Sequence, residues 1–381
     1  MNTQRLPFLD GLRVAAFLLL IPYHVGMYYV TWDWHVKSPA ASHVLEPFML
    51  MSAPWRLGLL FLVAGAACHD LLARRGVAGT LKDRTKRLLL PLIFGMLVIV
   101  PPQTYFELLT KAPELMLGDG SYLSFWAAYL KPAHLCRGKE CLDVPTWNHL
   151  WFVAYLWPYA VIATLVVAAA RRLPWRPRPV AMPTWAWLLV PALPLIVARL
   201  AVLPHFPSTH NFVVDPYNHL IFGWLFALGW ASRTPWAEGL WPHAQRARWP
   251  ALVLAVLGWA LWQTYAQGWL GLPAPPAVMV LQRTVWALMS WWAIVAACGF
   301  AQRLFATPRP WVRAVSKGVF CAYILHQTVI VLLTQALRPV ALPWGLEALL
   351  VLLLTFGLCA LAYLGLRRVP LVRGLVGVTA P

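Results

Sequence analysis

Three side chains that can carry out chemistry stand in one apolar stretch near the N-terminus. Asp10, Arg13 and His24 lie in "LDGLRVAAFLLLIPYHVGMYYV", which is otherwise almost entirely apolar. Arg13 and His24 are eleven residues apart, very nearly three helical turns, so a helix places both on one face about 16 Å apart. Asp10 precedes Arg13 by the three residues that allow an ion pair on a helix. Histidine exchanges protons near neutral pH and a cation stabilises an oxyanion, so the trio suits general-base chemistry.

The depth of this trio in an apolar run favours a function. A charged side chain at such a depth is costly unless it faces a protein interior or water. Taken singly, Arg13 could extend to the lipid headgroups, and His24 could be a hydrogen-bonded core residue. Together with Asp10 on the same face, they predict a functional cavity with His24, Arg13 and Asp10 as its catalytic candidates.

Other polar residues are candidates for the same cavity. Arg56 opens the second apolar run, His326 lies in the middle of a late run, and Trp151 follows "WNHL". Their ordinary alternatives are an interface anchor, a helix-packing hydrogen bond and a place in the aromatic belt. In "KDRTKRLLLP", Arg84 and Arg87 are either topology signals that touch lipid phosphates or a clamp for a phosphorylated cofactor.

These residues must be positioned by membrane helices. Of the 381 residues, 60% are hydrophobic and only 12% are charged, with a mean hydropathy of +0.63, whereas soluble domains carry roughly twice that share of charge. We expect an all-α fold, a polytopic transmembrane helical bundle that forms one domain over residues 1–381. Gly120 to Leu130 predicts an extra interfacial helix. Apolar runs of about 20 residues, enough to span a ~30 Å core, predict about ten helices that start near Leu12, Ser52, Leu88, Trp147, Trp185, Asn218, Trp249, Val278, Ser316 and Gly345.

The distribution of lysine and arginine predicts the orientation of the helices. With a cytoplasmic N-terminus, the inner segments hold 21 of the 31 basic residues and the outer segments hold six. Both termini should therefore be cytoplasmic. The net charge of +18 then reflects topology, and no nucleic-acid partner is expected. The first apolar run lacks the layout of a cleaved signal peptide, so we expect a permanent helix there.

Two cysteines lie outside the apolar runs, in a long outer loop. "CRGKEC" contains Cys136 and Cys141. A disulfide would suit a loop that faces an oxidising space such as the bacterial periplasm. A CxxxxC pair can also bind metal, but nothing nearby completes a four-ligand zinc site, so no metal centre is expected. The sequence leaves the bridging of the two cysteines open.

Four motifs in order resemble a known family. "FLDGLRVAAFLLLIPYH", "LLFLVAGAA", "RTKRLLLP" and "SKGVFCAYILHQTVI" are similar to those of the membrane acyltransferase type 3 family, over essentially the whole chain. Within it, "LDGLRV", "WHVKSP" and "NHLWFVAYL" look most like the osmoregulated periplasmic glucan succinyltransferases. The chain lacks the Glu-containing continuation that is typical of O-antigen acetylases; "FVAYLWPY" stands there instead.

The resemblance implies a membrane-bound O-acyltransferase of the bacterial inner membrane. Such an enzyme takes an acyl group from cytoplasmic acyl-CoA, either succinyl-CoA or acetyl-CoA, and delivers it to a carbohydrate hydroxyl on the outer side. The acyl-CoA is a donor substrate, and no permanently bound cofactor is implied. The implied acceptor is a periplasmic glucan. Carried over by motif, Arg13 and His24 are essential, and Arg84 and Arg87 help to hold the acyl donor.

The chemistry suggests further roles. Our hypothesis is that His24 is the base that activates the acceptor hydroxyl, while the acid and the guanidinium of its helix tune the cavity. Direct transfer and a route through an acyl-histidine are both open. A succinyl donor calls for a cation near its free carboxylate, and Arg56 is the candidate. Trp34 and His35, in the first outer loop, are candidate contacts for the sugar, with an interfacial belt as the alternative.

A different class of function would also use buried polar residues. Intramembrane Arg, His and Asp mark translocation paths, so the alternative is a transporter or flippase for a lipid-linked sugar or acylated glycan. The inverted-repeat pattern of many transporters is not evident in the sequence. A membrane scaffold would leave the polar trio unexplained. Consumption of acyl-CoA that depends on His24 separates the enzyme from both.

Overall fold

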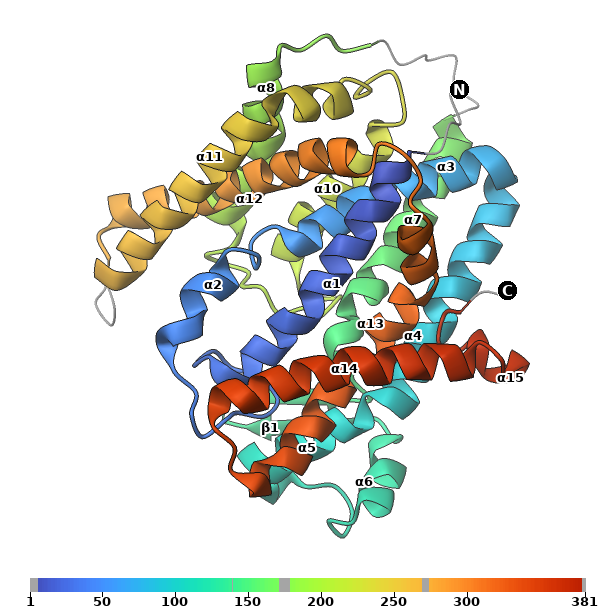
Figure 1. Cartoon of the computed structure of the whole chain (residues 1–381), viewed down its shortest axis with the longest axis vertical. Helices are drawn as coiled ribbons and strands as arrows, with labels where there is room; N and C mark the ends of the chain where they lie inside the picture. The colour runs from blue at the N-terminus through green and yellow to red at the C-terminus, as the bar shows by residue number, and fades with distance from the viewer. Residues whose placement is uncertain (1–5, 139, 171–178, 269–273, 379–381) are drawn as a thin grey trace. The chain divides into compact units, whose positions relative to one another are not determined.

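The structure is a computed structural model that describes residues 6–138, 140–170, 179–268 and 274–378. Helices form almost all of its regular structure, and the strands of the described residues make a single hairpin. The all-α class predicted from the sequence is therefore confirmed (Figure 1). Several residues of the topology argument lie outside the described residues, namely Arg5, Lys139, Arg171, Arg172, Arg176 and Arg178.

Seven helical segments of the described chain are long and apolar enough to cross a membrane. They are Pro7–Tyr29, Arg56–Ile99, Asn148–Ala170, Thr184–Val202, Pro276–Leu304, Pro310–Val340 and Trp344–Leu366.

The ten expected runs all overlap helical segments. The second and third runs lie in the single segment Arg56–Ile99, which continues through Gly76, a residue with a φ of 67°. Two further runs form α10 (Pro216–Ala231) and α11 (Leu240–Gly268), which are outside the set of seven. The number of helices that span the bilayer and the inner placement of both termini stay predictions.

Prolines interrupt the backbone hydrogen bonding of several helices. Proline has no backbone N–H, so it leaves the carbonyl four residues earlier without its helical partner. In α1 (Pro7–Tyr29), Pro22 removes the bond to the carbonyl of Leu18, two residues before His24. The segment Thr184–Val202 is divided by Pro191 and Pro194 into short α, 3-10 and π turns.

The chain divides into two compact units. The first comprises residues 1–16, 50–84 and 155–313, and the second comprises residues 17–49, 85–154 and 314–381. Each unit is described here by itself. Four helices contain residues of both units, namely α1, α2 (Glu46–Leu50), α7 (Trp151–Ala170) and α13 (Pro310–Leu337).

In the first unit, α3 (Arg56–Arg84) packs closely against α10. A Cβ atom on Gly65 would overlap the carbonyl oxygen of Phe226, and one on Gly229 would overlap the carbonyl of Leu62. The two backbones are thus in direct contact, as small residues permit in membrane proteins. The other elements of this unit are α8 (Thr184–Leu189), α9 (Leu193–Val197), and α11 side by side with α12 (Pro276–Leu304) (Figure 1).

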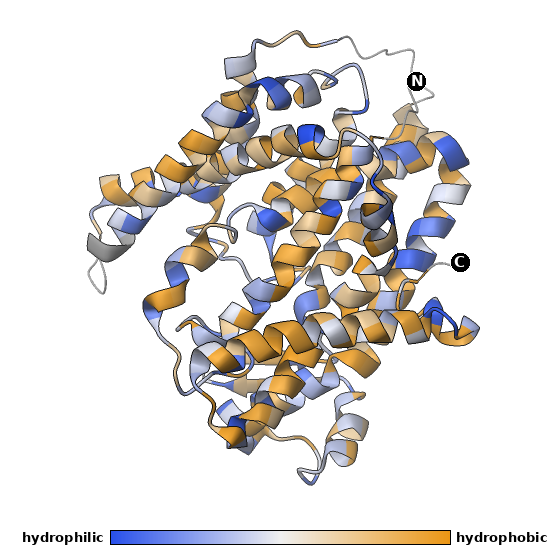
Figure 2. Ribbon diagram, in the orientation of Figure 1, coloured by the Kyte–Doolittle hydropathy of each residue, from blue (hydrophilic) through white to orange (hydrophobic). Residues whose placement is uncertain are grey.

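The second unit is built around α13. Val25 and Tyr28 of α1 and Trp34 of the following loop form a buried apolar cluster with Ile330 of α13 and Val351 of α14 (Trp344–Leu366). Figure 2 shows that α14 is apolar along most of its length. The remaining elements of this unit are α4 (Leu90–Phe94), α5 (Pro101–Lys111), α6 (Tyr122–Tyr129), β1 (Ala133–Arg137), β2 (Glu140–Val144) and α15 (Pro370–Arg373).

The long connection between α5 and α7 contains regular structure. Helix α6 lies in the stretch where an additional helix was expected. The strands β1 and β2 pair antiparallel with Cys136 opposite Cys141, and a disulfide joins these two residues. Since both sulfur atoms are bonded to each other, neither is a thiolate ligand for the alternative metal site, although His134 lies beside them.

Candidate active site

His24 forms a hydrogen-bonded pair with another histidine in the second unit. Its Nδ1 lies 2.8 Å from Nε2 of His326, although the two residues are 302 positions apart in the chain. The ring of His326 is fully buried in α13, and the ring of His24 in α1 is partly buried. The structure thus brings together two of the histidines that the sequence placed separately in the cavity.

The partners of His326 define the proton positions of this pair. Its Nδ1 lies 2.7 Å from the backbone carbonyl oxygen of Tyr323, which can only accept. Nδ1 of a neutral His326 therefore carries the proton, and its Nε2 is an acceptor. It follows that His24 donates from Nδ1, and that Nε2 is the basic nitrogen of His24.

A third histidine lies against the pair. The ring of His149 is 5.2 Å from that of His326, edge to face. Nε2 of His149 donates to the carbonyl of Ile324 at 3.0 Å, and the Tyr323 hydroxyl donates to the carbonyl of His149 at 2.6 Å. These bonds tie the start of α7 to α13, so the rings have fixed orientations.

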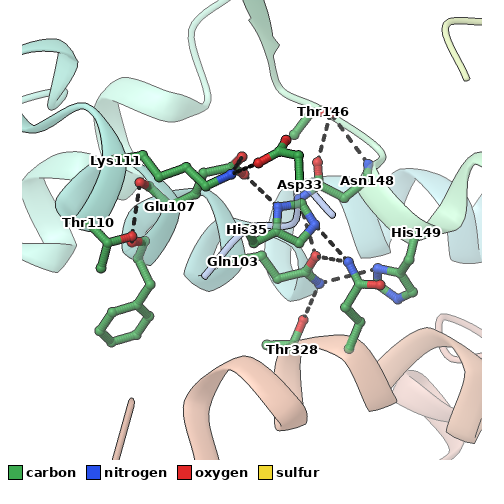
Figure 3. Close-up of polar contacts among 12 residues, drawn as sticks. Asp33, His35, Gln103, Glu107, Thr110, Lys111, Thr146, Asn148, His149 and Thr328 are labelled. Atoms are coloured by element: carbon green, nitrogen blue, oxygen red, sulfur yellow. Dashed lines mark hydrogen bonds and ion pairs between the residues drawn. The ribbon is translucent and has the colours of Figure 1, made fainter. Parts of the chain in front are cut away.

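Gln103 of α5 is the centre of a buried polar network, which Figure 3 shows. Its Nε2 donates to Oγ1 of Thr328 at 2.7 Å and to Nδ1 of His149 at 3.2 Å. Its Oε1 accepts from Nδ2 of Asn148 at 3.2 Å and from Nε2 of Gln327 at 3.0 Å. Both ends of this amide are therefore bonded, as buried polar groups require.

The network continues to an ion-paired cluster that joins the loop after α1 to α5. Gln327 donates to Nε2 of His35 at 2.8 Å, and Nδ1 of His35 donates to Oε2 of Glu107 at 2.5 Å. Lys111 lies 3.7 Å from Oε1 of Glu107 and 2.5 Å from Oδ1 of Asp33. Burial raises the pKa of Glu107, but His35 and Lys111 outweigh it, so this pKa lies below its ordinary 4.5.

An apolar groove of about 460 Å³ is also lined by His326. Helix α1 lines it with Leu20 and Ile21, and α14 lines it with Phe356. Along α13 its lining extends from Ala314 to His326. All of these residues belong to the second unit. His326 therefore contacts His149, a member of the polar network, and also lines an apolar groove.

Comparison with known proteins places the chain in a family. A family model described as an acyltransferase domain matches residues 6–364. The chain belongs to this acyltransferase family. Because the described residues also contain seven apolar helices, the protein is a multi-pass membrane member of the family. No solved structure matches the chain significantly.

Curated relatives of this acyltransferase-family protein match part of the chain with modest identity. The "Glucans biosynthesis protein C" of Salmonella schwarzengrund (strain CVM19633) is 29% identical over 149 residues, which are 39% of this chain and 35% of the relative. The protein of that name from Escherichia coli (strain SMS-3-5 / SECEC) is 27% identical over 175 residues, 45% of this chain and 40% of the relative. The chain thus spans well under half the length of these relatives.

The other two catalytic candidates of this acyltransferase lie in the first unit. Nη2 of Arg13 is 3.4 Å from Oδ1 of Asp10, the ion pair that their spacing predicted. Their side chains are 40% and 24% exposed, so the pair is not deeply buried. Asp10 also lines a pocket of about 130 Å³ together with Arg309 and Arg313.

The expected donor-binding arginines have different surroundings. Arg56 is 4% exposed, and its Nη1 lies 3.5 Å from Oγ of Ser52. Arg84 lies 3.8 Å from the buried carboxylate of Asp83. Arg87 is exposed. Arg56 and Arg84 belong to the first unit and Arg87 to the second. Their part in donor binding stays a prediction.

The expected acceptor contacts are more buried than the sequence suggested. Trp34 is 8% exposed within the apolar cluster around α13, and Trp151 is 9% exposed at the start of α7. Little of either ring is open for stacking on a sugar. His35 joins the network through Glu107 and Gln327. The role of all three in acceptor binding stays a prediction.

Sequence reasoning missed four members of the network, Gln103, Glu107, His149 and Gln327. Glu107 carries a signal, since it stands four residues before Lys111 at the spacing of a helical ion pair. Gln103 carries none, because one neutral amide near a helix start has no distinctive spacing.

Proposed function

We propose that the protein transfers an acyl group from acyl-CoA to a hydroxyl of a carbohydrate, and that His24 is the general base. The observation that carries this proposal is the 2.8 Å hydrogen bond between His24 and His326, which orients a basic Nε2. Membership of the acyltransferase family supports the reaction class. The printed names of the relatives concern glucan biosynthesis, and they support a glucan as the acceptor.

The reaction balances through one imidazole. The sugar hydroxyl attacks the thioester carbonyl carbon and forms a C–O bond, while its proton passes to Nε2 of His24. The tetrahedral oxyanion then collapses, the C–S bond breaks, and the leaving CoA thiolate takes the proton from His24. His326 keeps the ring in place throughout, because its Nε2 accepts from Nδ1 of His24 in both charge states.

We assign the donor to the cytoplasmic side, with Arg84 and Arg87 on the phosphates of acyl-CoA. Planar guanidinium groups match phosphate geometry, which supports this assignment. We propose succinyl-CoA as the donor and Arg56 as the cation that binds its free carboxylate. The burial of the Arg56 guanidinium supports this role, because a buried cation favours an anionic ligand. Acetyl-CoA, which has no free carboxylate, provides the matched comparison.

The deciding experiment measures free CoA released by the purified protein in lipid vesicles. Succinyl-CoA and acetyl-CoA are each supplied with and without a periplasmic glucan. We expect release that the glucan stimulates and that falls at least about a hundredfold in His24→Ala, since general-base catalysis supplies that much. His243→Ala, a substitution in α11 of the first unit, is the matched control and should retain the rate.

Two outcomes would change the proposal. Release that persists in His24→Ala would contradict a general base at this position. Consumption of neither donor by a folded protein that still binds glucan would favour the transporter or flippase. In the same assay, Arg56→Gln should lower the rate with succinyl-CoA more than with acetyl-CoA. Equal losses with both donors would remove the proposed selectivity.

A further inference from the structure

The apolar groove between α1, α13 and α14 differs in composition from the polar network centred on Gln103. Leu20, Ile21, Ala322 and Phe356 give it apolar walls. The hydroxyl of Tyr323, which also lines the groove, donates to the carbonyl of His149. The amides of a CoA arm would need hydrogen-bond partners in such a place, and burying them without partners is unfavourable. A hydrocarbon chain needs none.

One end of the groove is basic. Lys317 near the start of α13 and Arg367 just after α14 both line it, and both side chains are exposed. The guanidinium of Arg367 lies over the ring of Tyr363 at 5.8 Å, which holds it at the groove. Gly318 allows the close approach of the two helices here, because a Cβ atom would lie 3.1 Å from the Tyr363 ring. Two cations beside an apolar channel match a phosphate that carries a hydrocarbon chain.

Within the groove, the distance from Lys317 to His326 matches one leaflet of a bilayer. Lys317 and His326 are nine residues apart on one helix, which corresponds to about 14 Å of axial rise. Half of a ~30 Å hydrocarbon core is about 15 Å. A lipid whose phosphate is at Lys317 therefore places the end of its chain beside His326.

We infer that this groove binds an anionic glycerophospholipid. Its phosphate pairs with Lys317 and Arg367, and one acyl chain fills the groove as far as His326. The chain packs against the ring that orients His24 and excludes water from that face. This lipid site is separate from the acyl-transfer chemistry, since it involves no bond formation and its ligand is part of the membrane.

Native mass spectrometry of the protein in mild detergent tests the inference. Phosphatidylglycerol is titrated against phosphatidylcholine, whose choline neutralises the phosphate charge. We expect one tightly held phosphatidylglycerol in the wild type, and a roughly thirtyfold lower affinity in the double variant Lys317→Gln/Arg367→Gln. Arg303→Gln removes an exposed arginine at the end of α12, outside the groove, and should keep the wild-type affinity.

A second variant tests the apolar channel without changing charge. Ala360→Phe places a ring in the groove from an exposed position of α14, so it should fold normally and still lose the bound lipid. Unchanged phosphatidylglycerol binding in both variants would overturn the inference. Displacement of the bound lipid by succinyl-CoA or acetyl-CoA in the wild type would also overturn it, because the groove would then be the donor site. This binding measurement does not depend on transferase activity, so the two proposals fail separately.

Discussion

The Gln103 network and the apolar groove lined by His326 differ in nearly every physical property. In the network, amide, hydroxyl and imidazole groups centred on Gln103 are joined by hydrogen bonds of 2.7 to 3.2 Å. The groove, of about 460 Å³, is lined mostly by aliphatic and aromatic carbon. Directional bonds fix the angle of a ring, whereas apolar contacts fill space without fixing it. The hydrogen bonds of His326 to the Tyr323 carbonyl and to His24 orient the histidine pair, the network fixes the ring of His149 that packs on it, and the groove brings apolar surface to the ring of His326.

The largest expected effect is on kcat, and it comes from removing the ring of His326. His326→Ala deprives Nδ1 of His24 of its acceptor, so we expect kcat for CoA release to fall about a hundredfold with KM little changed, because His326 positions the base. His326→Gln retains an acceptor oxygen and should recover part of the rate. An alanine variant with the wild-type kcat, or a glutamine variant without any rescue, would contradict the positioning role.

The network alone is tested by Gln103→Leu. This substitution removes the buried hydrogen bonds of Gln103 to Asn148, His149 and Thr328, so we expect the free energy of unfolding to fall by about 3 kcal/mol. Thermal unfolding in detergent measures it. Thr110→Ala, which removes an exposed hydroxyl from the same helix, is the control and should unfold near the wild-type temperature. Equal unfolding temperatures for all three proteins would mean that the network contributes no stability.

The smallest expected effect is on the pH dependence of stability, and it concerns Glu107, the partner of His35 in the ion-paired cluster. Because the pKa of Glu107 is lowered below 4.5 in the folded protein, its ionised form stabilises the fold above pH 4.5, and this stabilisation is lost as the pH falls through the folded pKa. Glu107→Gln should therefore unfold at a lower temperature than the wild type at pH 7, and the difference should shrink at pH 3. Glu114→Gln, at an exposed carboxylate, is the control. A difference that is the same at both pH values would exclude the linkage.

The sequence predicted the class of fold and individual polar residues better than their pairing. Asp10 and Arg13 were paired correctly because helix geometry fixes the positions of residues three apart. The pair of His24 and His326 was beyond reach, since the relative depth of two helices depends on packing and loop lengths that periodicity does not encode. The cluster around Gln103 joins α5, the 3-10 turn Asn148–Leu150 before α7, and α13, so it was beyond reach for the same reason.

Burial was also hard to read from residue type. Tryptophans near a helix end suit both an exposed aromatic belt and a packed core. Trp34 proved to be a core residue because it meets α13 and α14, which are nearly three hundred residues later. Arg56 was an apparent interface anchor, yet its side chain is buried. In both cases the deciding contacts come from parts of the chain that no local pattern reveals.

The glycine contact between α3 and α10 has a mechanical consequence. With the backbones touching at Gly65 and Gly229, sliding either helix along the other would drive carbonyl oxygens into backbone atoms of the neighbour. This crossing therefore resists shear and moves as one body. A transport cycle of the alternating-access kind would have to place its moving boundary elsewhere in the protein, whereas a transferase needs no such motion at this crossing.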